Sequence, residues 1–80
     1  MEQSIKVGSG LGEKIRKARN AKDWTQDELA AKLQVNGCDM ERYTVSRIEN
    51  GKRHITVAEL HILKELLGMC YEDFLMQDEK

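Results

Sequence analysis

The feature that most constrains this chain is a pair of helical patterns separated by a short polar stretch. The first pattern, TQDELAAKL, begins at Thr25, and Glu28 follows three residues later, which is the spacing of an N-terminal capping box. Its apolar residues recur at helical spacing, as Leu29, Ala30 and Leu33. We therefore expect a helix that begins near Thr25 and turns one apolar face to a core.

The second pattern, ERYTVSRIENGKR, runs from Glu41 to Arg53. Val45 and Ile48 face inward at helical spacing, and the dipeptide Asn50-Gly51 is a typical helix end. The outward positions are occupied by Arg42, Tyr43, Ser46 and Arg47. Arginine, aromatic and hydroxyl groups on one face can donate to base edges and phosphates. The two patterns together predict a helix-turn-helix, whose second helix enters the DNA major groove.

Four segments of the chain carry a resemblance to a known family. They are LGEKIRKAR from Leu11, WTQDELAAKL from Trp24, TVSRIENGKR from Thr44 and TVAELHILKELLG from Thr56. These segments resemble the Cro/repressor-type (XRE-type) helix-turn-helix proteins of bacteria and their phages, over most of the chain from Leu11 to Phe74. The resemblance implies an all-α fold, a compact five-helix bundle of the lambda-repressor-like DNA-binding type with the helix-turn-helix at helices 2 and 3. The absence of proline and the few aromatic residues also favour a helical bundle over a sheet.

The helices are expected at residues 11–22, 26–33, 40–50, 56–67 and 71–76, the fourth of them opened by a second capping box at Thr56 and Glu59. Gly68 is expected to end the fourth helix, and Trp24 is expected to fill the core between the first two. Residues 1–10 are interpreted as a flexible N-terminal arm, 11–76 as the DNA-binding domain and 77–80 as a frayed C-terminus.

The connection between helices 2 and 3 departs from the family pattern. Residues 34–39 make it longer than the usual turn by about five residues. Asp39 is the expected N-cap of the third helix. Cys38 and Cys70 are interpreted as ordinary free thiols, with oxidation of Cys38 as an alternative if its position in the turn leaves it exposed. The longer turn leaves open how deeply the third helix enters the groove, and whether Met40 and Glu41 come near DNA.

Charge is unevenly distributed along the 80 residues, whose net charge is −1. Up to Arg53 the chain has 11 Lys/Arg against 8 Asp/Glu, and from His54 onward it has 2 against 6. The basic part coincides with the predicted DNA-reading helices and the acidic part with the tail. Because net charge governs non-specific affinity, we expect weak non-specific DNA binding and a reliance on base contacts for specificity.

Other function classes find little support in the sequence. There is no glycine-rich phosphate loop, nucleophile elbow or clustered acid–base pair, so we expect no enzyme and no cofactor or small-molecule ligand. The separations of Cys38, His54, His61 and Cys70 do not match a metal-ligand pattern. No apolar run is long enough to span a bilayer, and the first ten residues lack the apolar core of a signal peptide, so a cytoplasmic location is expected.

The candidate DNA-binding residues are Gln26, Arg42, Tyr43, Thr44, Ser46, Arg47, Lys52 and Arg53. Arg42, near the start of the third helix, is the expected bidentate partner of a guanine. Tyr43 would contact a thymine methyl or a phosphate, with partial burial in the core as an equal alternative. Arg47, one turn further, would reach a base or a flanking phosphate, and Lys52 and Arg53 would hold phosphates in the following loop.

Three further assignments come from the resemblance. It implies that Gln26 bonds the DNA backbone and braces the reading helix, and that Thr44 contacts DNA or caps locally. It also implies a partly buried structural ion pair between Arg19, late in the first helix, and Glu49 of the IENG run. Removing one partner of such a pair is expected to destabilise the fold.

The sequence therefore predicts a sequence-specific, double-stranded DNA-binding transcriptional regulator, repressor-like and homodimeric, with residues 40–50 as its reading helix. Phe74, Leu75 and Met76 in the fifth helix are the expected dimer interface, although they would equally complete the core. A phage Cro-like repressor, a restriction-modification controller and a small chromosomal regulator all remain open. The alternative function is a protein-interaction module, such as an antitoxin or a regulatory adaptor that uses the same fold.

Overall fold

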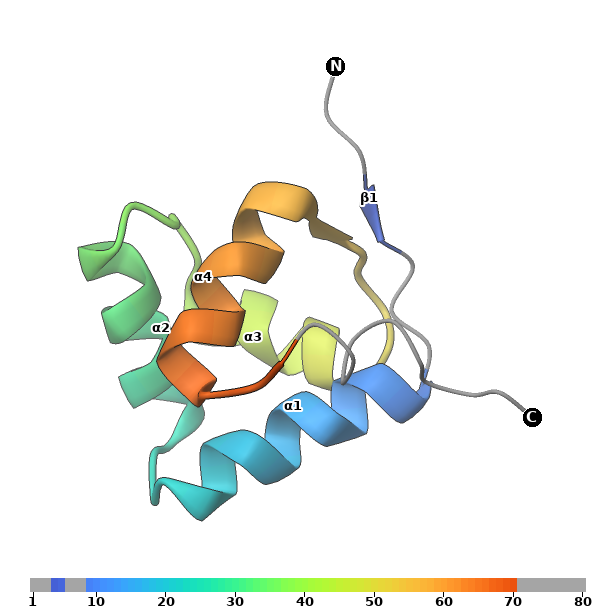
Figure 1. Cartoon of the computed structure of the whole chain (residues 1–80), viewed down its shortest axis with the longest axis horizontal. Coiled ribbons are helices and arrows are strands. Elements are labelled where there is room, and N and C mark those ends of the chain that lie inside the picture. The colour runs from blue at the N-terminus through green and yellow to red at the C-terminus, as the bar shows by residue number, and fades with distance from the viewer. Residues whose placement is uncertain (1–3, 6–8, 71–80) are drawn as a thin grey trace.

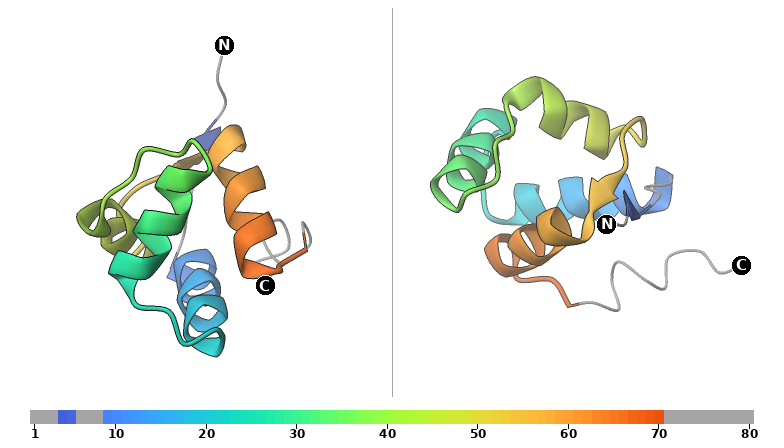
Figure 2. Two further views of the ribbon diagram at one scale, coloured as in Figure 1. Left: turned by 90° about the vertical axis from the view of Figure 1, so that its left-hand side faces the viewer. Right: turned by 90° about the horizontal axis from the view of Figure 1, so that it is seen from above.

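The computed structural model describes residues 4–5 and 9–70, and its elements are shown in Figure 1. The described helices are α1 (Ser9–Ala21), α2 (Gln26–Val35), α3 (Arg42–Glu49) and α4 (Val57–Leu67). In the right-hand view of Figure 2, α3 lies along one edge of the fold, and α1 and α4 lie on the other side. This compact helical arrangement is consistent with the expected lambda-repressor-like fold. The predicted fifth helix and the frayed C-terminus lie outside the described residues.

Both predicted capping boxes are confirmed. The Thr25 hydroxyl accepts from the backbone N–H of Glu28 at 3.0 Å, and the Glu28 carboxylate accepts from the backbone N–H of Thr25 at 2.8 Å. Thr56 and Glu59 repeat the arrangement at the start of α4, at 3.1 and 3.0 Å. Gly68 ends α4 in the left-handed conformation with φ of 68°, which glycine adopts without steric cost. These contacts are local, so the sequence specifies them directly.

A single apolar core joins the four helices. Its most deeply buried large side chains are Leu11, Ile15, Leu29, Leu33, Met40, Ile48, Ile55 and Leu63. Complete burial of one such side chain contributes roughly 1.5–3 kcal/mol to folding before chain entropy is counted. Helix α1 approaches α3 so closely at Gly12 that a Cβ atom there would lie 2.6 Å from the carbonyl oxygen of Ile48. The core therefore fixes the position of α3 through direct backbone contact with α1.

The N-terminal region differs from its prediction. Strand β1 (Ser4–Ile5) pairs antiparallel with strand β2 (Ile55–Thr56), so two residues assigned to the arm belong to a small ladder. Helix α1 begins at Ser9, earlier than the expected Leu11. Ile55 is fully buried ahead of α4, where its extended backbone needs hydrogen-bond partners, and β1 supplies them. A strand of two residues is too short to show an alternating pattern, so no sequence signal predicts it.

The long turn also differs from its prediction. Cys38 is a free thiol buried at 6% exposure, and burial raises the pKa of that thiol, which excludes the alternative of an exposed, oxidisable cysteine in the turn. Met40 is buried at 1% exposure, and its carbonyl accepts from the Gln34 amide at 2.7 Å. Because the side chains of Cys38 and Met40 are both taken into the core, the backbone stays non-helical until α3 begins at Arg42. The N-cap is Glu41 instead of the expected Asp39, with no side-chain cap bond.

Candidate nucleic-acid interface

The outer face of α3 gathers most of the predicted DNA-binding residues. Tyr43 is 70% exposed, which excludes the alternative that it packs in the core. The Arg42 side chain is 63% exposed, and its guanidinium lies 3.8 Å from the Asp27 carboxylate of α2. Thr44 and Ser46 are half-buried on the same helix. The first five residues of α3 therefore carry a cation, an aromatic ring and two hydroxyls.

Arg47 is held in place by two contacts. Its guanidinium carbon lies 5.8 Å from the centre of the Tyr43 ring, a cation–π distance. Its Nη2 donates to the backbone carbonyl of Lys52 at 3.0 Å, which ties the end of α3 to the loop that follows. Arg47 is half-buried by these contacts, whereas the Lys52 side chain is exposed. Contacts with Tyr43 and Lys52 thus hold the Arg47 side chain in place. The exposed Arg42 side chain, by contrast, has the Asp27 carboxylate, 3.8 Å away, as its ion-pair partner.

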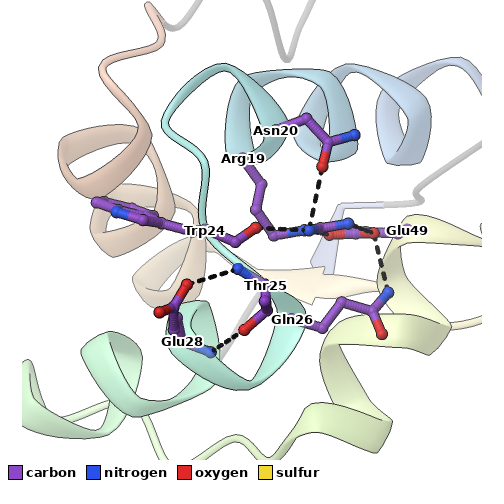
Figure 3. Close-up of polar contacts among 7 residues, drawn as sticks. All are labelled: Arg19, Asn20, Trp24, Thr25, Gln26, Glu28 and Glu49. Atoms are coloured by element: carbon purple, nitrogen blue, oxygen red, sulfur yellow. Dashed lines mark hydrogen bonds and ion pairs between the residues drawn. The ribbon is translucent and has the colours of Figure 1, made fainter.

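The inner face of α3 is anchored by an ion pair, which Figure 3 shows. Arg19 donates from Nε and Nη2 to the two carboxylate oxygens of Glu49, at 2.7 and 3.0 Å. The Arg19 and Glu49 side chains are only 9% and 1% exposed. Hydrogen bonding to Glu49 raises the pKa of Arg19 above its usual value, despite the opposing effect of burial. Arg19 also donates to the backbone carbonyl of Trp24 at 2.8 Å, so one guanidinium joins α1, α3 and the start of α2.

Gln26 belongs to the same network. Its side-chain amide donates to Glu49 Oε1 at 3.0 Å, and in Figure 3 it reaches from the first turn of α2 toward the ion pair. This bond connects the two helices of the helix-turn-helix through the carboxylate of the second. Gln26 therefore braces α3 as the resemblance implied, while its bond to a DNA phosphate stays a prediction.

Arg53 is less available for a phosphate contact than the sequence suggested, because its guanidinium is already paired within the protein. It donates to both carboxylate oxygens of Glu59 at 3.0 and 3.2 Å, and to the backbone carbonyl of His54 at 2.9 Å. Its side chain is 34% exposed. Burial alone would raise the pKa of Glu59, but hydrogen bonds from Arg53 and Thr56 outweigh it and lower that pKa. In this structure Arg53 ties the loop to the N-terminus of α4, and Lys52 is the more accessible cation of the two.

The Glu59 carboxylate makes the stability of this loop dependent on pH. Because its pKa is lower in the folded protein, ionised Glu59 contributes fully above its ordinary pKa of 4.5, and the contribution is lost as pH falls below that value. We expect Glu59→Gln, which keeps an oxygen for the capping box, to be less stable than the wild type at pH 7, and the difference to shrink as pH falls from 4.5 toward 3. Urea unfolding at both pH values measures the difference. An unchanged difference at pH 3 would contradict this assignment.

Over residues 4–5 and 9–70, no three His, Cys, Asp or Glu side chains gather as metal ligands do. None of the helices in the same part of the chain combines the length and the hydrophobicity that a membrane span requires. Sequence reasoning missed the contact of Asp27 with Arg42 and the close approach at Gly12. Neither leaves a local signal, because each joins segments distant in the chain.

Comparison with known proteins identifies the family. A family model described as helix-turn-helix matches residues 15–75, well over half of the chain. The chain is 33% identical to control protein C.MunI of Mycoplasma sp over 71 residues, which cover 88% of this chain and 89% of that protein. Both matches include α2, α3 and the turn between them, and they indicate a family of regulators rather than of enzymes. The chain belongs to the XRE-type helix-turn-helix family of DNA-binding transcriptional regulators.

Proposed function

We propose that this protein reads a specific double-stranded DNA operator with α3 in the major groove, as a repressor-like homodimer. The observation that carries the proposal is the division of α3 into two faces. Glu49, Val45 and Ile48 are buried and anchor the helix, whereas Arg42 and Tyr43 are exposed at its N-terminal end. A helix whose inner face is anchored in the core and whose outer face is exposed to solvent suits direct reading of base edges.

The eight candidate residues fall into two groups in this proposal. Arg42, Tyr43 and Arg47 read bases or the thymine methyl, with Thr44 and Ser46 beside them. Lys52 holds a phosphate directly, whereas Gln26 and Arg53 contribute to phosphate binding from positions that their partners Glu49 and Glu59 fix. In a dimer, two copies of α3 would occupy successive major grooves about 34 Å apart on a near-palindromic site.

The similarity to a control protein bears on the biological setting. Of the three settings that the sequence left open, it favours the restriction-modification controller over a phage Cro-like repressor or a chromosomal regulator. A DNA-binding regulator of this type works in the cytoplasm, and we place this chain there. The operator is then expected next to the genes that the protein controls.

Selection of bound sequences from random duplex DNA tests the proposal. We expect an enriched near-palindrome whose affinity survives physiological salt. Binding that is weak, shows no sequence preference and disappears with salt would refute a sequence reader. A protein-interaction module, such as an antitoxin, would then become the leading function.

Arg42→Ala tests the reading helix itself. We expect it to weaken binding to the selected operator by about 1–2 kcal/mol and to relax the preference at one base pair of each half-site, because a bidentate guanine contact is lost. Lys17→Ala removes one exposed cation from α1 and is the matched control. It should weaken binding little and leave the preference unchanged, as titrations against the selected site and its single-base variants will show. Equal effects of the two changes would contradict base reading by Arg42.

A further inference from the structure

The carboxylate of Asp27 lies beside the proposed reading helix without belonging to it. Asp27 is the second residue of α2 and follows Gln26, whose side chain is proposed to contribute to phosphate binding. Its Oδ1 lies 3.8 Å from Nε of Arg42, the first residue of α3. Because α2 and α3 pack against each other, this ion pair joins the two helices at the end of α3 that is proposed to face bases.

The fold itself gains little from this ion pair. The Asp27 and Arg42 side chains are 77% and 63% exposed, and water competes strongly for an ion pair at such a position. The N-terminus of α2 is capped by Thr25 and Glu28, so Asp27 is not needed for the capping box. Replacing Asp27 should therefore leave the fold intact, and the effect of its carboxylate falls mainly on Arg42.

The position of Asp27 at Nε suits a guanidinium that reads a base. Guanidinium is a planar fork with five N–H donors, so it can accommodate more than one acceptor at the same time. A carboxylate at Nε leaves the Nη1–Nη2 edge of the fork to face the acceptors O6 and N7 of a guanine. In such a complex Arg42 would contact Asp27 and the guanine together.

The same carboxylate would act against DNA that lacks this guanine. A long arginine side chain that loses its base partner can turn to a nearby phosphate, and this new contact offsets part of the loss. Asp27 would hold Arg42 away from such phosphates, and its own negative charge would repel them. Specificity depends on weak binding to the wrong sites as much as on strong binding to the right one.

We propose that Asp27 is a positioning residue that determines the specificity of DNA reading. Its carboxylate holds Arg42 toward a guanine and away from phosphates, so that DNA without that guanine is bound less tightly. This inference rests on the proposed function of α3 and adds to it a residue that lies on α2.

The contact is tested first in the full chain without DNA, through the NMR signal of the Arg42 Nε–H group. Asp27→Asn removes the charge and keeps the shape of the side chain. Glu41→Gln is the matched control, because Glu41 is exposed, precedes Arg42 in the chain and makes no side-chain cap bond. We expect Asp27→Asn to move the signal far more than Glu41→Gln does, with circular dichroism unchanged in both. A signal that Asp27→Asn leaves in place would overturn the proposal.

Operator titrations then test the specificity. They compare the selected operator with a variant that lacks the guanine at which Arg42→Ala relaxes the preference. We expect Asp27→Asn to reduce the discrimination between the two by about two- to fivefold, the scale of an exposed ion pair, chiefly by tighter binding of the variant site. Glu41→Gln should change both affinities alike. Asp27→Glu should restore the discrimination, and Asp27→Asn should have no effect on it in the Arg42→Ala background, because Asp27 acts through Arg42.

The other outcomes separate this inference from its alternatives. Equal losses of discrimination for Asp27→Asn and Glu41→Gln would overturn it in favour of a general effect of charge. A changed preference at a second base pair would overturn it in favour of a direct base contact by Asp27. A wild-type protein without sequence preference would overturn the proposed function as well. A wild-type preference at the Arg42 base pair that Asp27→Asn leaves intact would overturn this inference alone.

Discussion

Glu49→Ala is expected to lower the free energy of unfolding by about 3–5 kcal/mol, because it leaves the Arg19 guanidinium buried without its counter-charge. Glu49 is 1% exposed and accepts three hydrogen bonds, two from Arg19 and one from Gln26. The substitution therefore removes the carboxylate around which α1, α2 and α3 meet. Urea denaturation followed by circular dichroism measures the loss. For a small domain with a total stability of about 5–15 kcal/mol, a loss of this size approaches unfolding.

Glu13→Ala is the matched control for this experiment. Glu13 also pairs with an arginine, Arg16, at 3.2 Å, but the two side chains are 50% and 43% exposed. An exposed pair contributes only about 0–1 kcal/mol, so the control should remain close to wild type. Arg19→Met/Glu49→Leu should recover part of the loss by replacing both charges with apolar groups. Similar losses for Glu49→Ala and Glu13→Ala would show that burial does not set the strength of the pair.

Gly12→Ala is expected to lower the free energy of unfolding by about 2–3 kcal/mol, although alanine is the better helix former. The added Cβ atom would lie 2.6 Å from the Ile48 carbonyl and in direct conflict with the carbonyl of Glu49. Both obstacles are backbone atoms at the end of α3, so α3 must move away from α1. Because α3 is the proposed reading helix, operator affinity should fall as well, even at temperatures where the variant is folded.

Gly10→Ala separates this clash from the ordinary effect of replacing glycine. Gly10 lies in the same helix, and a Cβ atom there would meet nothing within 4 Å. We expect Gly10→Ala to stabilise the protein by up to about 1 kcal/mol, through helix propensity, and to leave DNA binding unchanged. Thermal unfolding and operator titration of the two variants give the comparison. Stabilisation by Gly12→Ala would refute the close packing of α1 on α3.

The helix caps of α2 and α4 and the inward-facing positions of α3 were predictable from the sequence. The two capping boxes, the glycine end of α4 and the inward positions Val45 and Ile48 all appear where the pattern placed them. Each of these features depends on residues three or four apart, whose interaction is fixed once a helix forms. The outward direction of Arg42 and Tyr43 follows from the same periodicity.

Only the tertiary structure decided which polar residues remain available on the candidate interface. The sequence placed Gln26, Arg53 and Arg47 alike among the DNA contacts, yet Gln26 bonds Glu49, Arg53 pairs with Glu59 and Arg47 caps the carbonyl of Lys52. The sequence likewise could not show that Met40 enters the core and delays the start of α3. The helical period of a sequence predicts which face of the helix a side chain occupies. It does not predict which residues of other segments contact that side chain. Local hydrogen bonding thus determined the helices of this protein, whereas packing between distant segments determined which of their charged side chains remain exposed on the proposed DNA-binding face.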